Sequence, residues 1–179
     1  MIEKAIRHKR TKASGSDEMT YEMFKNLDND TLLHFLEIFN KSWILGEVPD
    51  AWRHSIVVPI LKPGKEPSSP HSYRPIALTS HACKIMESMI AARLKWFLEK
   101  HRIINPFQSG FRSNRSTQDN IIAFHNEIYK NISNKRTVVA VFIDIKRAYD
   151  TVWREGLPSK IHALGIRGRI LKWISAFSF

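Results

Sequence analysis

Residues 141–153, VFIDIKRAYDTVW, decide the fold of this chain. They complete an apolar run that starts at residue 137, and this run predicts a buried β-strand over 137–145. Every second residue of the strand shares one face, which consists of Val138, Ala140, Phe142 and Asp144. Asp144 therefore lies on the buried face, at the carboxyl end of the strand. A carboxylate in that position loses solvation and needs a compensating cation or several hydrogen-bond donors.

Two interpretations of Asp144 fit this position. A magnesium ion is a suitable cation, because it is usually held by one or two carboxylates together with substrate phosphates. Two-metal phosphoryl transfer uses that arrangement to activate the attacking oxygen and to stabilise the leaving one. The alternative is that Asp144 caps the following helix by accepting backbone N–H groups. Asp150, the second acid of the stretch, is predicted to be structural, with Arg147, Arg154 or nearby backbone as its partner.

The composition favours a basic, folded domain. The 179 residues are 43% hydrophobic, which is enough for one domain with a real core. The 28 Lys and Arg residues exceed the 17 Asp and Glu residues, which gives a formal net charge of +11. A domain this basic usually faces phosphate, on nucleic acid or at a membrane surface. The alternative is a solvated basic surface without a partner.

The cysteine content excludes two classes of small, cross-linked protein. The sequence has one cysteine, Cys83, which excludes an internal disulfide framework and a cysteine-rich zinc site. Its neighbours Ile85 and Met86 predict a buried, inert thiol. This composition suits a reducing, intracellular setting, and no apolar run approaches the length of a membrane span.

The first third of the chain predicts a lead-in, a helix and a strand. Residues 1–16 are basic and then small, which predicts a flexible lead-in. A helix capped by Asn29 or Asp30 has apolar residues at core spacing and ends at Gly46. Residues 55–62, SIVVPILK, predict a strand, and Pro59 within it favours an edge position.

The remaining patterns are loops that alternate with helices. Four prolines make residues 63–75 a loop. A helix capped by Thr79 or Ser80 follows, and its apolar stripe is typical of a core face: Ile85, Met86, Met89, Ile90, Leu94, Phe97 and Leu98. A polar, basic loop over 105–116 precedes a helix that begins at Ser116 or Thr117.

The end of the chain completes the prediction of the fold class. Residues 157–179 predict two short helices joined at Gly165. The alternation of helix and strand predicts an α+β fold or an α/β layer. The apolar C-terminus, KWISAFSF, is the pattern expected of a chain that is cut within a domain.

Residues 141–153 strongly resemble the first catalytic motif of reverse transcriptases from non-long-terminal-repeat (LINE-type) retrotransposons. Three upstream segments resemble the same family in the same order. They are KASGSDEMTYEMFK (12–25), which opens the polymerase domain; VPILKPGK (58–65) with YRPIALTSHACKIMESMIAARL (73–94), in the fingers; and QSGFRSNRSTQDNI (108–121), before the palm. The resemblance covers nearly the whole chain, and four motifs in series are far more specific than one.

The resemblance implies an incomplete right-hand polymerase fold with helical fingers, the first palm strand and the helices that follow it. It implies three divisions of the chain. A basic flexible lead-in occupies 1–16, the fingers and part of the palm occupy 17–136, and the start of the catalytic palm occupies 137–179. The last division is truncated before the second catalytic motif.

In the palm, the resemblance implies roles for three residues. Asp144 matches the catalytic, first metal-binding aspartate, and Ile145 matches the neighbour whose backbone carbonyl assists the metal. Tyr149 matches the aromatic residue that walls the sugar pocket and discriminates against a 2′-hydroxyl. The metal interpretation of Asp144 therefore replaces the helix cap. The implied cofactor is Mg2+, in a two-metal site that is incomplete in this chain.

In the fingers, the resemblance implies phosphate and template contacts. Arg74 matches the arginine that lies against the triphosphate, a task that suits a permanently charged, forked guanidinium. Lys62 or Lys65 supplies a second charge, and the pattern does not choose between them. The segment that supports the template and the nucleotide pocket corresponds to Gln108, Gly110, Phe111 and Arg112.

Some positions depart from the family pattern. Ser16 and Glu18 stand where relatives tend to carry proline and glycine. Tyr149 stands where phenylalanine is commoner, and deoxynucleotide preference is expected to survive that change. No two aspartates are adjacent in the sequence, so the aromatic-x-Asp-Asp hairpin of the second catalytic block is absent, as is the glycine-rich motif between the blocks. One carboxylate and one carbonyl bind magnesium weakly, so this chain alone is predicted to be inactive.

The first functional hypothesis is a fragment of an RNA-directed DNA polymerase, a nucleotidyltransferase. The intact enzyme transfers deoxynucleotides to a primer 3′-hydroxyl, with an RNA template, a DNA primer and deoxynucleoside triphosphates as partners, without a membrane, and in the nucleus. The second is a non-catalytic, nucleic-acid-binding remnant of the same domain. An unrelated magnesium hydrolase that uses Asp144 and Asp150 is disfavoured by the four motifs. Half a palm leaves a sheet edge and apolar surface uncovered, which predicts self-association.

Overall fold

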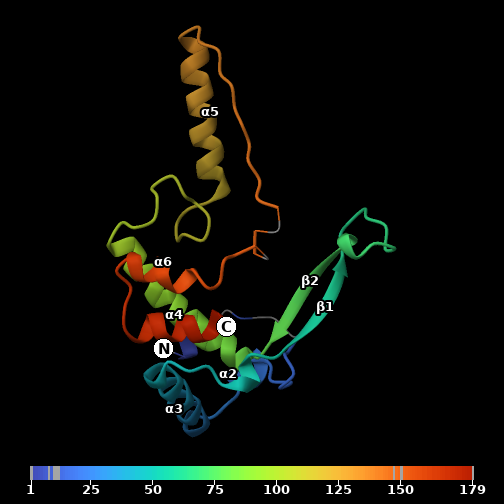
Figure 1. Cartoon of the computed structure of the whole chain (residues 1–179), viewed down its shortest axis with the longest axis vertical. Coiled ribbons are helices and arrows are strands. Elements are labelled where there is room, and N and C mark those ends of the chain that lie inside the picture. The colour runs from blue at the N-terminus through green and yellow to red at the C-terminus, as the bar shows by residue number, and fades with distance from the viewer. Residues whose placement is uncertain (1, 8, 10–12, 147, 150, 179) are drawn as a thin grey trace. The chain divides into compact units, whose positions relative to one another are not determined.

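The computed structural model describes residues 2–7, 9, 13–146, 148–149 and 151–178. These residues divide into two compact units, which are residues 1–94 with 154–179 (unit 1) and residues 95–153 (unit 2). Helices dominate, and strands β1 (Ser55–Leu61) and β2 (Tyr73–Thr79) form a two-stranded sheet (Figure 1). This confirms the prediction of a chain that mixes helices with strands. None of the described helices is both long enough and apolar enough to cross a membrane.

Helix α3 (Asn29–Leu45) begins and ends at residues that satisfy its free backbone groups. The Asp28 carboxylate accepts a hydrogen bond from the Thr31 N–H at 2.7 Å, so Asp28 caps the helix in place of the predicted Asn29 or Asp30. Gly46 ends the helix, as predicted, in the left-handed conformation with φ of 68°.

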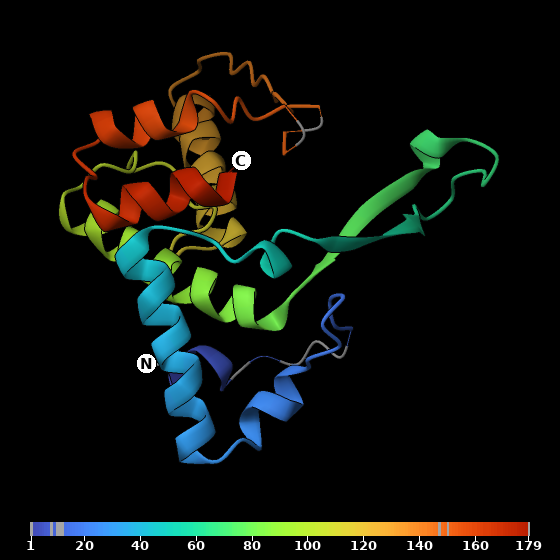
Figure 2. The same cartoon turned by 60° about the horizontal axis from the view of Figure 1, so that its bottom comes forward.

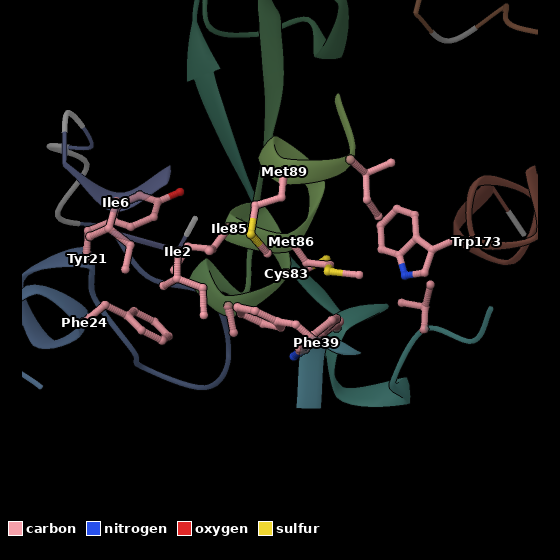
Figure 3. Packing of buried hydrophobic residues seen from close by; sticks show 14 residues of the cluster. Ile2, Ile6, Tyr21, Phe24, Phe39, Cys83, Ile85, Met86, Met89 and Trp173 are labelled. Atoms are coloured by element: carbon pink, nitrogen blue, oxygen red, sulfur yellow. The ribbon is translucent and has the colours of Figure 1, made fainter. Parts of the chain in front are cut away.

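Helix α4 (His81–Lys100) supplies the centre of the core of unit 1. The Ser80 hydroxyl accepts a hydrogen bond from the Cys83 N–H at 3.4 Å, which confirms the predicted cap. The predicted apolar stripe is buried over its first turns, and Figure 3 shows its residues between the side chains of Tyr21 and Phe24 and the ring of Trp173. Burial raises the pKa of Cys83 to about 12, so the thiol is inert as predicted.

Two helices follow residue 154, and the second of them packs on α3. Helices α6 (Leu157–Ala163) and α7 (Arg169–Ser178) lie side by side (Figure 2), which confirms the predicted pair of tail helices. The indole N–H of Trp173 donates to the Ser42 hydroxyl at 3.0 Å, and this hydroxyl donates to the Glu47 carbonyl at 2.6 Å. Trp173 is 2% exposed, so the contact between α7 and α3 combines apolar burial with a satisfied polar group.

The predicted lead-in contains a short helix, α1 (Ile2–Ile6). Ile2 and Ile6 are four residues apart, so they share one face of the helix, and both are buried in the core of unit 1. A second short helix, α2 (Tyr21–Lys25), is capped by Thr20. The N-terminal residues therefore take part in the packing of the core, which the basic composition of the predicted lead-in did not indicate. Unit 2 crosses the predicted boundary at 136/137, and the division into fingers and palm stays a prediction.

The segment over 13–19 crosses the N-terminus of α4 at very short range. A Cβ atom on Gly15 would lie 2.6 Å from the Ser80 nitrogen, so only glycine fits there. The imidazole of His81 stacks on the Tyr21 ring, with centroids 3.9 Å apart and planes 14° apart. His81 is fully buried, and neither ring nitrogen makes a hydrogen bond with the described residues.

Strands β1 and β2 form an antiparallel hairpin in which Pro59 faces Pro75. Strand β1 was predicted, and its edge position is confirmed because both strands of a two-stranded sheet are edges. The predicted loop over 63–75 is wrong at its end, because β2 begins at Tyr73. A short 3-10 turn precedes each strand, η1 (Asp50–Trp52) before β1 and η2 (Pro70–Ser72) before β2.

The two facing prolines explain how this hairpin tolerates them. The Lys62 N–H donates to the Ser72 carbonyl at 2.8 Å, which makes that pair a hydrogen-bonded one in the same register. Such pairs alternate with pairs whose backbone groups point outward, so Pro59 and Pro75 occupy an outward pair. Neither proline removes a bond from the ladder, and each removes one donor from an outer edge.

Unit 2 contains the end of α4, helix α5 (Thr117–Ser133) and the extended stretch over 134–146. Ser116 and Asp119 form a capping box at the start of α5, which confirms the predicted start. The predicted strand over 137–145 is wrong for the described residues, because this stretch has no strand hydrogen bonds and its side chains are largely exposed. A strand exists only with a hydrogen-bonded neighbour, and the described residues offer this stretch none.

Candidate functional site

Asp144 lies in the extended stretch of unit 2 and is exposed. The predicted buried face is absent, since Phe142 is 83% exposed although its ring contacts Phe124 edge-to-face at 5.6 Å. Ile145 and Tyr149, the other two candidate palm residues, are 69% and 79% exposed. Asp150 lies outside the described residues. The desolvation argument for Asp144 therefore does not hold in this arrangement, whereas its implied catalytic role stays a prediction.

The described residues do not fit a two-metal site. Across residues 2–7, 9, 13–146, 148–149 and 151–178, no three His, Cys, Asp or Glu side chains come together as metal ligands would. Asp144 offers one solvated carboxylate, and Mg2+ bound to so few protein ligands is held weakly. No catalytic step can be assigned to a metal within this arrangement.

The tip of the β1–β2 hairpin carries the three candidate phosphate-binding residues. Arg74 stands opposite Ile60 in the register and is exposed. The ammonium of Lys62 donates to the His71 carbonyl at 2.7 Å, so this lysine closes the hairpin loop. Lys65 is exposed and makes no side-chain contact of this kind among the described residues. Lys65 and Arg74 are therefore the cations of the hairpin that a phosphate can reach without breaking the loop.

The four residues of the predicted template segment lie in one tightly bonded loop of unit 2. The Arg112 guanidinium donates to both carboxylate oxygens of Glu99, from Nε at 2.8 Å and from Nη2 at 2.7 Å. Its remaining nitrogen, Nη1, donates to the carbonyls of Asn105 and Gln108 at 3.2 and 3.3 Å. The Gln108 side-chain amide donates to the Gly110 carbonyl at 3.2 Å. The structure therefore brings Gln108, Gly110 and Arg112 together, and Arg112 serves the loop itself.

The interaction between Glu99 and Arg112 shifts the pKa of both side chains. The hydrogen bond with Arg112 lowers the pKa of Glu99, and the same bond raises the pKa of Arg112. Arg115 is close enough to lower the pKa of Glu99 as well. A forked pair of this kind fixes direction as well as distance, which a lysine at residue 112 could not do.

The pair also lies at the point where α4 ends. The Ile103 N–H donates to the Leu98 carbonyl and the Arg102 N–H donates to the Glu99 carbonyl, the two bonds of a Schellman motif. Arg102 has φ of 53°, in the position that usually holds glycine. Glu99 thus lies in the last turn of α4. Its carbonyl accepts from the Arg102 N–H at the helix end, and its carboxylate accepts from Arg112 of the following loop.

Sequence reasoning missed Glu99. It lies thirteen residues before Arg112, with a helix end and a polar loop between them, so no periodic pattern links the two. A carboxylate in the last turn of a helix is unfavourable beside the negative end of the helix dipole, and this was the available signal that Glu99 has a partner.

Two surface hollows of unit 1 contain none of the candidate residues. One, of about 470 Å³, is lined by Ile38, Lys41, Ser42, Leu45, Glu47, Val48, Pro49, Asp50 and Arg53. The other, of about 780 Å³, is lined by Glu3, Ile6, Arg7, Phe24, Lys25, Leu27, Asn29 and Leu32. The candidate residues therefore lie outside these two hollows.

Known proteins of one kind match this chain. Residues 60–178 match the family described as "Reverse transcriptase (RNA-dependent DNA polymerase)". The chain is 35% identical to the probable RNA-directed DNA polymerase from transposon BS of Drosophila melanogaster, over 86% of this chain and 17% of that protein. It is 33% identical to the probable RNA-directed DNA polymerase from transposon X-element of the same fly, over 90% of this chain and 18% of that protein.

A third relative agrees with these two. The RNA-directed DNA polymerase from mobile element jockey of Drosophila melanogaster is 34% identical, over 86% of this chain and 17% of that protein. The chain spans less than a fifth of the length of these curated relatives. The family match covers the hairpin tip, the Gln108–Arg112 loop and Asp144 alike. The chain therefore belongs to the reverse transcriptase (RNA-dependent DNA polymerase) family, among the polymerases of LINE-type, non-long-terminal-repeat retrotransposons.

Proposed function

We propose that this chain forms the fingers and the first part of the palm of a right-hand RNA-directed DNA polymerase. The observation that carries the proposal is the family match over residues 60–178, because this range contains every candidate site residue. The intact enzyme binds an RNA template and a DNA primer. It transfers nucleotides from deoxynucleoside triphosphates to the primer, by in-line attack of the 3′-hydroxyl on the α-phosphorus with pyrophosphate as the leaving group.

The hairpin tip is proposed to hold the triphosphate of the incoming nucleotide. Arg74 is exposed and its guanidinium can fork onto two phosphate oxygens. Lys65 is proposed as the second cation, in preference to Lys62, because the Lys62 ammonium already holds the His71 carbonyl. Tyr149 is proposed to wall the sugar pocket, where its ring would leave no space for a 2′-hydroxyl.

Enzymes of this family generally use a divalent metal, and we propose Mg2+ at Asp144 and the Ile145 carbonyl. Because the described residues bring no three metal-binding side chains together, the site needs ligands beyond those that they gather there. The chain by itself is therefore expected to bind nucleic acid without extending a primer.

Primer extension tests both parts of the proposal. The isolated chain is expected to give no product on an RNA template with a DNA primer and Mg2+. A chimera in which residues 60–178 replace the matching segment of the jockey polymerase is expected to extend the primer. Asp144→Asn in that chimera is expected to reduce extension to background, while Glu127→Gln, an equal loss of charge on exposed α5, leaves it unchanged. Extension by the isolated chain, or by the Asp144→Asn chimera, would contradict the proposal.

A second candidate function is a non-catalytic nucleic-acid-binding domain. The absence of a metal-ligand cluster among the described residues favours it. Its binding would be dominated by phosphate contacts and tolerant of sequence, with a logarithmic salt slope of about −0.7 per phosphate on a single strand. A chimera that binds RNA with such a slope and never extends a primer would favour this candidate over the polymerase.

A further inference from the structure

Several side chains of the loop over 105–112 make hydrogen bonds within the loop or to the helices on either side of it. Besides the four bonds of Arg112, the Asn105 carboxamide oxygen accepts from the Phe107 N–H at 2.9 Å. The Ser109 hydroxyl donates to the Asn120 side chain on α5 at 2.7 Å, and the Gln108 N–H donates to the Asn105 carbonyl at 3.0 Å. The loop is therefore bonded to both helices that flank it, through Arg112 to Glu99 of α4 and through Ser109 to Asn120 of α5.

Phe107 and Phe111 are both exposed in this loop, and Phe111 is the one of the two with positive φ. Its backbone has φ of 61°, a left-handed conformation that is a genuine outlier for a bulky side chain. Its ring is 79% exposed, so the strain is not offset by burial. Glycine precedes it at residue 110, yet the chain places the aromatic side chain in the strained position. Strain of this kind persists only where the surrounding bonds determine it, and it concentrates at ligand-binding positions.

We propose that Phe111 is a stacking platform for a base of single-stranded RNA and that Glu99 is the positioning residue that fixes it. Glu99 acts through Arg112, the residue next to Phe111, because its carboxylate binds the Arg112 guanidinium and fixes its orientation. This inference deepens the proposed function and rests on its nucleic-acid binding. An exposed aromatic ring among cations is the combination that binds single strands, because every base presents a face to stack on.

The charges of unit 2 favour RNA over a protein partner for this ring. Basic residues outnumber acidic ones in residues 95–153. Glu99 is neutralised by Arg112, and Asp119 accepts from the Ser116 N–H at 2.6 Å, so both acids nearest the loop are occupied. Arg115 is exposed and is close enough to both acids to lower the pKa of each, so one cation near the loop is available to a phosphate.

The test uses the full 179-residue chain and two fluorescent probes. One is an oligo(rU) strand of about 12 nucleotides, and the other is an abasic strand of equal length. Phe111→Ala is expected to weaken oligo(rU) binding about tenfold and to leave abasic binding unchanged, because it removes stacking and no charge. Phe111→Trp is expected to preserve the preference for oligo(rU).

Two further variants separate function from folding. Phe111→Gly is expected to raise the melting temperature, since it relieves the left-handed strain, while it weakens oligo(rU) binding as strongly as Phe111→Ala. Glu99→Gln is expected to weaken oligo(rU) binding although it makes the chain more basic. Glu127→Gln, which changes the charge equally on α5, is expected to strengthen binding of both probes slightly.

The outcomes are distinguishable. If the wild-type chain binds neither probe, the proposed function and this inference both fail. If the wild type binds and the Phe111 and Glu99 variants keep its preference for oligo(rU), this inference alone fails. Equal weakening on both probes would assign the two residues to folding or to phosphate binding. A change in self-association with unchanged RNA binding would assign the ring to a protein contact, and either result overturns the inference.

Discussion

Five described residues other than glycine adopt positive φ, and at each the side chain has a steric cost that glycine avoids. Glu18 is informative among them, because the family resemblance predicts glycine at that position. Its φ is 56°, and its N–H donates to the Gly15 carbonyl at 3.1 Å to close a turn. Ser16, where relatives tend to carry proline, is the second residue of the same turn, a position that favours proline. The residues that the resemblance predicts, proline at 16 and glycine at 18, would suit the backbone that this chain adopts.

Replacing Glu18 by glycine is expected to stabilise the chain. A left-handed residue with a Cβ costs about 1–2 kcal/mol, and the added freedom of glycine in the unfolded chain returns part of that. The expected gain is about 0.5–1 kcal/mol in the free energy of unfolding, measured by urea denaturation. Glu18→Gln removes the charge and keeps the Cβ, so it is expected to change little. Equal gains from both variants would show that charge, and not strain, is responsible.

His81 predicts a loss of stability in mild acid. Burial lowers the pKa of this imidazole, with Lys84 adding to the effect. The charge of Asp17 opposes this lowering of the pKa, as do nearby backbone groups of Met19 and Ala13, although neither backbone group is in hydrogen-bond geometry. Below the ordinary pKa of 6.5 the unfolded chain takes up a proton that folded His81 resists, so stability falls as pH decreases from about 6.5 toward the lowered value. Above that window both states are neutral and the effect is absent.

Denaturation midpoints at about pH 7.5 and pH 5.5 measure this effect. The contribution of His81 is expected to be at most about 1.4 kcal/mol per pH unit, the limit for one proton. His81→Phe keeps a ring against Tyr21 and is expected to flatten the pH dependence, whereas His54→Gln, at an exposed position, leaves it steep. A His81→Phe profile as steep as that of the wild type would rule out His81 as its source.

At the scale of elements, residues at the ends of helices correctly predicted where those helices begin or end, because the contacts that stabilise a helix end are local. Gly46, Ser80 and Ser116 end or begin helices as predicted, because each satisfies backbone groups next to it in sequence. The start of β2 was missed because prolines disfavour strands in general, and only the register shows that Pro75 points its missing donor outward.

Non-local contacts limited the prediction of the site. The stretch over 137–145 has strand composition, but strand formation depends on a neighbour that composition does not specify. Glu99 is likewise found through its contact with Arg112 across a loop. The motifs identified the family and the loops that carry the candidate residues. The implied roles of Asp144, Tyr149 and Arg74 stay predictions.

The docking of α7 on α3 is expected to depend strongly on Trp173. Trp173→Ala removes a buried indole and is expected to cost about 3–5 kcal/mol of unfolding free energy. Trp173→Phe keeps much of the ring and loses the bond to the Ser42 hydroxyl, at about 1 kcal/mol. Trp96→Ala, at a tryptophan that is 61% exposed, serves as the control and is expected to cost less than either. Chemical denaturation that ranks Trp96→Ala above Trp173→Ala would refute this account of the interface.

At the scale of the molecule, a large positive charge coexists with much uncovered apolar surface. The extended stretch of unit 2 alone exposes five apolar residues by more than two thirds, namely Val139, Val141, Phe142, Ile143 and Ile145. Exposed apolar surface of this extent marks an interaction site or an association hazard. We propose that copies of this chain associate through that stretch, against the repulsion that the charge of +11 provides.

Adding a charge to that stretch is expected to weaken the association. Ile143→Lys should require an about tenfold higher protein concentration for the same degree of association, a change of about 1.4 kcal/mol. Ser68→Lys adds the same charge in the exposed hairpin loop and is expected to have a smaller effect. Sedimentation velocity over a range of concentrations measures both. A chain that stays monomeric throughout would dismiss the proposal.

The outward prolines of the hairpin have a consequence for how such assemblies can grow. Pro59 and Pro75 each remove one N–H donor from the outer edge of their strand, so a third strand cannot pair with either edge of the hairpin without losing a hydrogen bond. The stretch over 137–145 contains no proline and has no comparable interruption. Fibre-like stacking of this protein would therefore use residues 137–145 and not the edges of the β1–β2 hairpin.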